Sequence, residues 1–472
     1  MVRIPPTTSN AVSQLVEPLP PPPQLSHVLS ITSIPSVTFT LDGAPKTTPF
    51  SEKILDGPHE VVFQASLSRQ NLVFGFGGWS DGDPNATRTI LLAADTFLLA
   101  VYLSPVGILT GDSDRATLSI AQRGGRKMFR DAMGKYLVFY VNTSKKICLC
   151  VNNGDPGVQG WLPAFRHTTG PDLRRPAVVL TGSNEARVIA ARDIGGIIDI
   201  PVLLTRDAIG NVVDVAFGPA ELVDDIGSWP AAIVAHDGSI WVVYSRRDTL
   251  GSSIVAAHWT LGGWTRETIL TDTIDLQAMF PNVLERGDNS RLYMVANRDA
   301  SSPNTTMVFN SATFANGVWT WGAPVLVWKT KISRGPQDAP DMVWDARSNL
   351  ALILHDVSGE EFYALFGLDA QDLETRFDTP VLAIVNNEWG LLHVDPVTGD
   401  FAIAMMNGST TGTIGWVFRR GGVWTTSLLL ADSGPENLGI LGLSDSFDIV
   451  YGKAPSPGST SPPVQIRYAR VM

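Results

Sequence analysis

The sequence of 472 residues contains only two cysteines, Cys148 and Cys150. Two residues apart on a strand, they would share one face, where a mutual bridge is strained. We therefore expect free thiols, with no disulfide framework and no zinc site. No run of about 18 apolar residues is present, so no membrane span is predicted. The N-terminal segment lacks the apolar centre of a secretory signal, so no classical signal peptide is predicted either.

Basic residues are also scarce. The chain has 35 Lys and Arg against 46 Asp and Glu, a net charge of -11, and no basic run longer than two. Binding along a phosphate backbone needs clustered cations, so no nucleic-acid partner is expected. Charged residues make up 17% of the chain and hydrophobic residues 44%, and there are 43 glycines and 32 prolines. This composition predicts a turn-rich, all-β protein, and the length exceeds one ordinary core.

The first 32 residues form a proline-rich arm or linker. Pro18 and the run from Pro20 to Pro23 favour polyproline II, which packs into neither helix nor sheet. Two interpretations stay open at this point. The segment is either a disordered leader or an arm that docks on a partner subunit.

Residues 33–104 predict a small antiparallel β domain. Val37, Phe39 and Leu41 alternate with threonines, and Asp42-Gly43 supplies a hairpin turn. Further apolar strands separated by turns follow up to Tyr102.

The sequence of this region resembles the PEGA domain and the internalin B-repeat module. The resemblance covers about 70 residues and implies a spacer or adhesive unit without catalytic residues. The matching positions are Asp42, Gly43, Thr47, Thr48, Pro49, Gly57, His59, Val61, Gly78, Trp79, Arg88, Thr89, Ile90, Ala94, Asp95 and Thr96.

Residues 105–472 repeat with a period of about 50 residues, which is typical of β-propeller blades. Innermost strands are predicted to start near residues 174, 228, 279, 338, 388 and 439, several of them at an X-Pro step. Seven apolar second strands predict seven blades, with six as the alternative because the first blade (about 125–173) has unclear limits. An open last blade would leave unpaired edges. We predict that residues 116–122 close the ring by pairing with the C-terminal blade.

Polar and aromatic residues recur where the innermost strands begin and where the second strands end. In a propeller these points meet at one mouth of the central channel. Arginine and tryptophan at such a mouth suit a sugar, through hydrogen bonds and stacking. The predicted ligand-binding residues are Arg175, Trp229, Arg247, Arg298 and Trp389. The repeated Arg-Asp pairs have a second interpretation, as turns or ion pairs between blades.

The propeller also resembles, weakly, the sialidase-like superfamily, through Gly-Gly-x-Trp turns such as Gly262-Gly263-Trp264 and 421–424. The resemblance implies an arginine cluster for a substrate carboxylate, which Arg175, Arg247 and Arg298 could form. It also implies a tyrosine nucleophile with a glutamate, and an acid/base aspartate. No such Tyr-Glu pair and no intact Asp-box are evident in the sequence.

The sequence as a whole favours a non-enzymatic, surface-displayed structural or adhesion protein, most specifically a virion component such as a tail, fibre or capsid-decoration protein. Residues 1–104 would contact other subunits of a multicopy assembly, and the propeller would face host glycans or neighbouring subunits at the virion surface or outside the cell. One alternative is an extracellular propeller lectin. The other is a propeller glycoside hydrolase or lyase that acts on surface polysaccharide, with its carboxylates chosen from Asp193, Asp248, Asp299, Asp341 and Asp356.

No cofactor is expected. Calcium binding remains an alternative at two short acidic segments, because carboxylate oxygens are the ligands that calcium prefers. These segments are Asp81-Gly82-Asp83 and Asp112-Ser113-Asp114.

Overall fold

A computed structural model gives the arrangement of most of the chain. It describes residues 25–69, 72–114, 127–248, 251–260, 263–272, 276–300, 306–329, 340–345, 350–357, 362–368, 375–376, 387–394, 401–407, 413–420, 423–431, 435–443, 446–453 and 464–471. These residues form an all-β protein, as the composition predicts. No helix within them has the length and apolar character needed to cross a bilayer.

The chain divides into two compact units. One comprises Met1–Phe63 and Trp79–Ala100, and the other comprises Gln64–Gly78 and Val101–Met472. The strands up to residue 103 form two antiparallel sheets. The four-stranded sheet has the order β3 (Ala44–Thr47), β2 (Thr38–Leu41), β5 (Gly57–Val62), β8 (Thr87–Leu92). The five-stranded sheet has the order β4 (Phe50–Leu55), β1 (Ser26–Ile34), β9 (Thr96–Leu103), β7 (Leu72–Trp79), β6 (Ser66–Arg69).

Aromatic side chains fill the core of the first unit. Phe39 stacks on Phe63 with ring centroids 5.0 Å apart, and Phe50 and Trp79 meet this pair edge-on. The hairpin between β2 and β3 turns at Asp42 and Gly43, whose φ angles of 52° and 77° are those of the Asp-Gly turn that the sequence predicts. The resemblance to PEGA modules stays a prediction.

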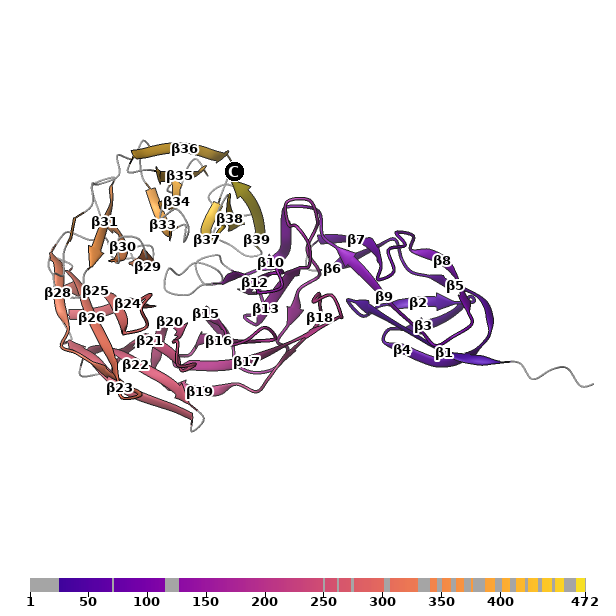
Figure 1. The fold of residues 1–472 in the computed structure, drawn as a ribbon, viewed down its shortest axis with the longest axis horizontal. Helices are drawn as coiled ribbons and strands as arrows, with labels where there is room; N and C mark the ends of the chain where they lie inside the picture. Colours follow the sequence, from indigo (N-terminus) through magenta and orange to yellow (C-terminus); the bar gives the residue numbers. More distant parts are fainter. Residues whose placement is uncertain are drawn as a thin grey trace, which may run out of the picture. The chain divides into compact units, whose positions relative to one another are not determined.

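Seven further sheets form the blades of a β-propeller, numbered here in chain order (Figure 1). Blade 1 comprises β11 (Met128–Arg130), β12 (Tyr136–Val141), β13 (Ile147–Asn152) and β14 (Phe165–Arg166). Blade 2 comprises β15 (Leu173–Leu180), β16 (Glu185–Arg192), β17 (Ile197–Arg206), β18 (Val212–Phe217) and β19 (Glu221–Asp224). Blade 3 comprises β20 (Gly227–Val234), β21 (Ile240–Arg247), β22 (Ser252–Thr260) and β23 (Gly263–Asp272).

The remaining blades follow the same plan. Blade 4 comprises β24 (Leu276–Glu285), β25 (Arg291–Ala300), β26 (Thr306–Ala315), β27 (Val318–Trp321) and β28 (Val325–Lys329). Blade 5 comprises β29 (Asp341–Asp345), β30 (Leu350–Val357), β31 (Phe362–Leu368) and β32 (Thr375–Arg376). Blade 6 comprises β33 (Asn387–Val394), β34 (Phe401–Asn407), β35 (Thr413–Arg420) and β36 (Val423–Ala431). Blade 7 comprises β37 (Pro435–Leu443), β38 (Ser446–Lys453), β39 (Val464–Val471) and β10 (Ile108–Ser113).

The first strand of each blade is the innermost one. Each contacts the innermost or second strand of a neighbouring blade, and β37 returns to β11, so the ring closes. The second strands are continuous apolar runs because both of their faces are covered. In β12, for example, every residue from Tyr136 to Val141 is buried. The prediction of seven blades is confirmed.

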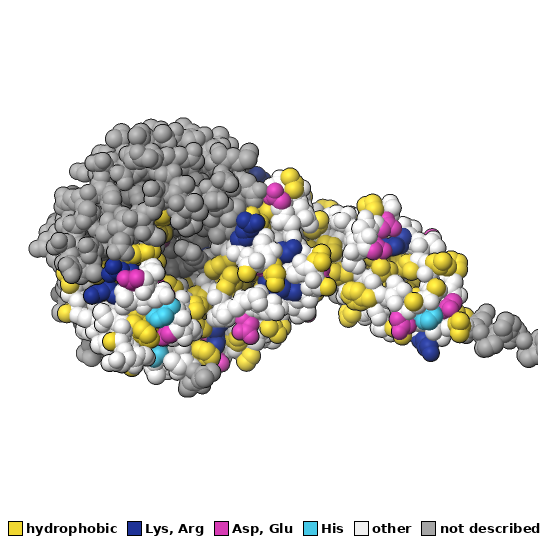
Figure 2. Space-filling model, viewed as in Figure 1, with side chains coloured by type: hydrophobic (Ala, Val, Ile, Leu, Met, Phe, Trp, Pro, Cys, Tyr) yellow, Lys and Arg dark blue, Asp and Glu magenta, His cyan; other side chains and the backbone are white. Residues whose placement is uncertain are grey.

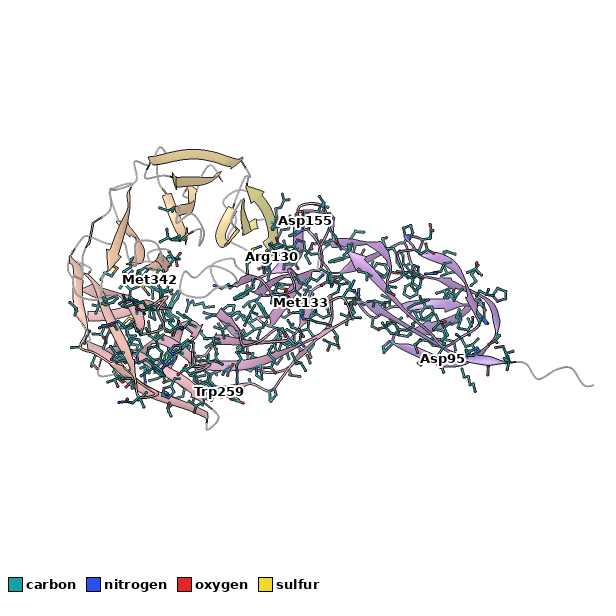
Figure 3. All side chains as sticks on the ribbon, viewed as in Figure 1. Asp95, Arg130, Met133, Asp155, Trp259 and Met342 are labelled. Carbon is teal, nitrogen blue, oxygen red and sulfur yellow. The ribbon has the colours of Figure 1, made fainter. Side chains whose placement is uncertain are left out.

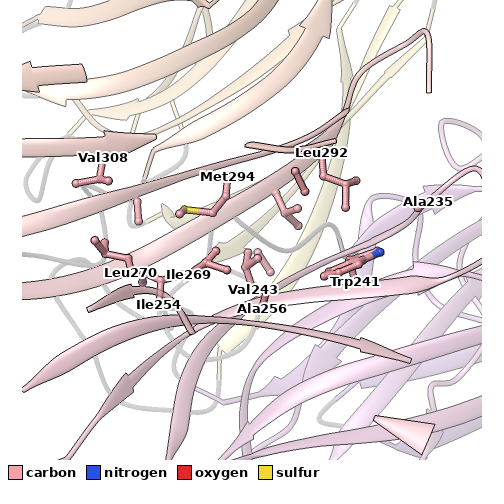
Figure 4. Packing of buried hydrophobic residues seen from close by; sticks show 14 residues of the cluster. Ala235, Trp241, Val243, Ile254, Ala256, Ile269, Leu270, Leu292, Met294 and Val308 are labelled. Carbon is pink, nitrogen blue, oxygen red and sulfur yellow. The ribbon is translucent and has the colours of Figure 1, made fainter. Parts of the chain in front are cut away.

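Apolar side chains of neighbouring blades pack against one another. In the cluster of Figure 4, Trp241 and Val243 of blade 3 pack with Leu292 and Met294 of blade 4. The partly buried Trp319 and Trp321, from the outer hairpin of blade 4, pack against the same cluster. These tryptophans therefore serve as wedges between blades.

The strand that closes the ring differs from the predicted one. β10, residues 108–113, pairs antiparallel with β39, with register shifts after Ile108 and Thr110. The predicted closing strand, 116–122, lies outside the described residues. The reason for the error is that β10 carries buried polar groups and so lacks an apolar alternation. Its Asp112 accepts hydrogen bonds from Thr110 (2.6 Å) and Tyr140 (2.8 Å) and contacts Arg166.

The core beneath β10 gives a test of closure. Leu109 is fully buried in the cluster that joins blades 7 and 1. Leu109→Ala is expected to lower the free energy of unfolding by about 2–5 kcal/mol, because it leaves a cavity. The matched control Val106→Ala, at a half-exposed position three residues earlier, should change it by less than about 0.5 kcal/mol. Denaturant unfolding measures both. Equal effects would contradict the role given to β10.

The first unit holds a histidine whose two ring nitrogens both face acceptors. His59 Nδ1 lies 2.7 Å from the Asp42 carboxylate and Nε2 lies 2.7 Å from the Leu55 carbonyl oxygen. A carboxylate and a carbonyl only accept hydrogen bonds, so both nitrogens must donate, which requires the imidazolium form. The hydrogen bonds to Asp42 and Leu55 accordingly raise the pKa of His59 above 6.5.

This raised pKa predicts how stability depends on pH. A group whose pKa is higher in the folded state stabilises it fully below the unfolded pKa, and this contribution is lost as the pH rises through the folded pKa. The first unit should therefore become less stable as the pH rises through and above 6.5. Denaturant unfolding of the wild type and His59→Gln between about pH 5 and pH 9 measures this. The difference between the two should shrink with rising pH, and a difference that grows would refute the assignment.

Candidate functional site

The strand register brings the starts of the innermost strands and the ends of the second strands to one edge of the propeller. Leu173 at the start of β15 pairs with Arg192 at the end of β16. Likewise Gly227 pairs with Arg246 in blade 3, and Leu276 pairs with Ala300 in blade 4. The starts of the innermost strands and the ends of the second strands therefore surround the same mouth of the ring.

Three innermost strands share an unusual backbone conformation just inside this mouth. Arg175, Trp229 and Phe280 have φ angles of 51°, 55° and 54°. Each is followed by proline, and the pairing with the second strand shifts register at the same point in all three blades. Left-handed backbone is costly for bulky side chains and persists only where the surroundings enforce it. Such strain, repeated at one mouth, is typical of a functional site.

The three side chains form a continuous row, which we call the mouth ladder. The guanidinium carbon of Arg175 lies 3.3 Å from the centroid of the Trp229 ring. The Trp229 ring meets Phe280 edge-on, with centroids 4.5 Å apart. The structure thus brings together Arg175 and Trp229, two of the predicted ligand-binding residues, and adds Phe280.

The Arg175 guanidinium is largely removed from water and has unused donor capacity. Its Nε has no hydrogen-bond acceptor among the described residues. Burial, and then the neighbouring Arg174, lower the pKa of Arg175 to about 10. The side chain therefore remains a cation at neutral pH. A desolvated cation with free N–H groups favours an anionic partner such as a carboxylate.

Asp193, a predicted acid/base residue, lies beside the mouth ladder but is already occupied. Its carboxylate forms ion pairs with Arg174 of its own blade and with Lys145 of blade 1. This arrangement is the ion pair between blades that the sequence offered as the second interpretation. A carboxylate held between two cations is poorly suited to act as a proton donor.

Asp341, a second predicted carboxylate, begins the innermost strand of blade 5 and is buried. It accepts hydrogen bonds from the amides of Met342 (3.0 Å) and Leu392 (2.7 Å) and from the Asn282 side chain (3.2 Å). These contacts tie together the innermost strands of blades 4, 5 and 6.

A lysine that the sequence did not single out belongs to the same region. Lys127, which precedes β11, is 5% exposed. Burial lowers the pKa of its amine to about 7, although the nearby Asp341 carboxylate acts in the opposite direction. No local sequence signal marks this residue, since blade 1 lacks the X-Pro step that indicates the starts of blades 2 to 5.

The other predicted site residues are less informative. Arg247 and Asp248 are exposed at the end of β21 and in the turn after it, where Asp248 accepts a hydrogen bond from Gly251. The backbones of Arg298, Asp299, Asp356 and Trp389 lie in β25, β30 and β33, at the mouth edge. Their side chains lie outside the described residues.

Arginine side chains pair with aspartates of the two acidic segments for which the sequence left calcium binding undecided. Arg88 pairs with both Asp81 (2.8 Å) and Asp83 (3.5 Å), and Arg166 pairs with Asp112. Within the described part of the chain, no group of three His, Cys, Asp or Glu side chains could hold a metal ion. On the face shown in Figure 2, the described charged side chains are scattered and form no extended patch of one sign.

Two described carboxyl groups have a pKa raised by burial, and both lie away from the innermost strands. Asp199 on β17 reaches a pKa of about 6 even though Arg187 is 2.6 Å away, and the pKa of Glu267 on β23 is also raised. Neither of these two groups therefore belongs to the pair of carboxyl groups that the alternative of a glycoside hydrolase would need at the mouth.

Comparison with known proteins identifies the fold. No protein-family model matches the sequence, and no curated protein matches it. An ulvan lyase of polysaccharide lyase family PL25 aligns at a TM-score of 0.52 and 11% identity, covering 77% of this chain and 94% of its own. A structure of an ulvan lyase of this family bound to -[GlcA(1-4)Rha3S]- aligns at 0.52 and 12%, with the same coverage. An exo-beta-1,3-galactanase from Phanerochaete chrysosporium aligns at only 0.34 and 13%, covering 57% and 64%.

The similarity at this level of identity shows the fold, a β-propeller. It also corrects our prediction of a non-enzymatic virion component. Two structures that share the fold over most of both chains are polysaccharide lyases, and neither the virion nor the adhesion prediction gains any support.

The pairing of Asp193 gives a direct test of its role. Asp193→Asn removes the charge that holds Lys145 and Arg174, so the free energy of unfolding should fall by about 1–2 kcal/mol, allowing for partial exposure of the cations. The control Asp248→Asn, at an exposed turn, should change it by less than about 0.5 kcal/mol. Denaturant unfolding gives both values. A stable Asp193→Asn protein with abolished glycan cleavage would instead make Asp193 catalytic.

Proposed function

We propose that this protein is a polysaccharide lyase that cleaves an acidic, uronate-containing glycan at the mouth of its propeller. The observation that carries the proposal is the mouth ladder, in which the Arg175 guanidinium stacks on Trp229 and keeps donors free. The shared fold with PL25 ulvan lyases supports it.

The chemistry of the mouth suits recognition of a sugar carboxylate. A guanidinium binds a carboxylate through two parallel hydrogen bonds, and it does so most strongly where water is excluded. Trp229 and Phe280 add apolar surface against which the non-polar face of a sugar can pack. Arg175 would thus bind the uronate carboxylate, and the aromatic pair would orient the ring.

Elimination fits these residues better than hydrolysis. In an elimination, a base removes the proton on the carbon next to the carboxylate, and the glycosidic oxygen leaves as a double bond forms. The cation that binds the carboxylate stabilises the negative charge that develops during proton removal. Hydrolysis would instead need two carboxyl groups with separated pKa values, whereas Asp193 and Asp341 are both committed to other contacts.

The test is cleavage of a panel of uronate-containing and neutral polysaccharides by the purified chain. Elimination is expected to give fragments with an unsaturated terminal sugar that absorbs ultraviolet light and contains no added water, as mass spectrometry would show. Arg175→Gln should lower kcat/KM by about 10²–10³, since it removes a charge-stabilising donor. Arg291→Gln is the matched control, because Arg291 begins β25 at the opposite edge of blade 4, and it should retain activity within about twofold.

Three results would contradict the proposal. Fragments that have gained water would indicate a hydrolase. Retention on the glycan without cleavage would indicate a lectin. Equal losses of kcat/KM in Arg175→Gln and Arg291→Gln would show that the activity does not depend on the mouth.

A further inference from the structure

One position recurs on the innermost strands of blades 1 to 5. It lies four residues before the residue whose amide closes the hairpin to the second strand. In blades 1 to 4 a backbone amide closes this hairpin by donating a hydrogen bond to a carbonyl oxygen at the start of the second strand. The donor and acceptor residues are Asp131 and Lys135, Thr181 and Glu185, Ala235 and Ser239, and Arg286 and Arg291. The residue four positions before each amide donor is structurally equivalent from blade to blade, and we call this set of residues the inner ring. In blades 1 to 4 its members are Lys127, Ala177, Ala231 and Asn282.

Blade 5 contributes Asp341, which follows a proline as Asn282 does and starts the pairing of β29 with β30. All five of these residues are buried. In blades 2, 3 and 4 the inner ring lies two residues beyond the mouth ladder. The inner ring therefore lies deeper in the channel than the mouth ladder.

The described inner ring contains one cation and one anion. They belong to blades 1 and 5, which are not neighbours, so their electrostatic interaction crosses the channel. In Figure 3 the labelled residues Arg130 and Met342 mark the innermost strands of these two blades on opposite sides of the centre. Blade 2, which neighbours blade 1, contributes the small side chain of Ala177 to the inner ring.

Three N–H donors hold the Asp341 carboxylate in place. This carboxylate acts electrostatically on the amine of Lys127. Among the described members of the inner ring, Asp341 is the charged group that faces this amine, while Ala177, Ala231 and Asn282 are uncharged.

The amine itself is in a state suited to accept a proton. Burial lowers its pKa to about 7, so a substantial fraction is neutral at neutral pH. A general base works best when its pKa lies near the working pH, and desolvated lysines are known to fill this role.

We propose that Lys127 is the general base of the elimination, an inference that rests on the proposed function. The Lys127 nitrogen forms a bond to the proton on C5 of the uronate whose carboxylate Arg175 binds. The electron pair of the broken C5–H bond forms the C4=C5 double bond. The C4–O4 bond breaks, and its electron pair leaves with O4, which takes a proton from water. The ammonium of Lys127 then returns its proton to the hydroxide so formed.

The rival role for Lys127 is a purely structural strut to Asp341. Arginine separates the two roles, because it keeps the positive charge but cannot act as a base near neutral pH. Lys127→Arg should therefore retain the unfolding midpoint of the wild type while kcat falls by about 10²–10⁴ and KM changes little. Lys127→Ala should lose activity to a similar degree, and added small primary amines should restore part of it.

Lys135→Arg is the matched control. Lys135 binds the Asn153 carbonyl oxygen and Asn211 at the hairpin on the opposite edge of blade 1, so activity should stay within about twofold. If the arginine variant does not fold, Lys127→Met, which matches the length of the side chain without its charge, takes its place.

The outcomes distinguish this proposal from the one beneath it. Elimination by the wild type that survives in Lys127→Arg or Lys127→Met would overturn the base and leave the lyase intact. Loss of activity in Lys127→Ala without any rescue by amines, together with a lowered unfolding midpoint, would indicate the strut. A wild type that cleaves no uronate polysaccharide would overturn both.

Discussion

The pairing of β10 with β39 is the contact on which the rest of the propeller depends. A sheet cannot leave a long edge unpaired without inviting association with other chains, and a ring of blades removes every such edge only when its last blade is completed. Here residues 108–113 complete a blade whose other strands lie beyond residue 434. The mouth exists only as a consequence of this closure. Lys127 of blade 1 and Asp341 of blade 5 interact across the channel because the ends of the chain meet.

Much of this fold could be predicted from the sequence, because each blade repeats a local pattern. Apolar second strands, Asp-Gly and Gly-Gly turns and a period of about 50 residues mark the blades without any knowledge of distant contacts. The closing strand escaped this reasoning for a physical reason. It is short and irregular, and its buried Thr110 and Asp112 are stabilised by Tyr140 and Arg166 from blade 1. Residues 116–122 have the regular alternation that β10 lacks.

The candidate site was predictable to the extent that its residues carry a local mark. The X-Pro steps locate Arg175 and Trp229, because in blades 2, 3 and 4 the residue before the proline is left-handed and the strand pairing shifts register there. Lys127 has no such mark. From the sequence a lysine is expected at the surface, and only the ring of equivalent positions reveals that this one is buried opposite an aspartate. Asp193 shows the reverse. Its residue type suggests chemistry, and its neighbours Arg174 and Lys145 give it a structural role.

The net charge of the chain is negative, whereas the mouth ladder carries a cation largely removed from water, Arg175. This contrast bears on the acidic ligand that we propose. A protein with a net charge of -11 repels a polyanion at long range, but salt screens such forces beyond about 8 Å. Within that distance Arg175 would act on the proposed ligand, because Asp193 beside the mouth ladder is already paired with Arg174 and Lys145. A neutral sugar would leave the free donors of Arg175 without a charged partner, whereas a uronate would satisfy them. The same cation then stabilises the charge that forms when the neighbouring carbon loses its proton, so one residue can serve both recognition and chemistry.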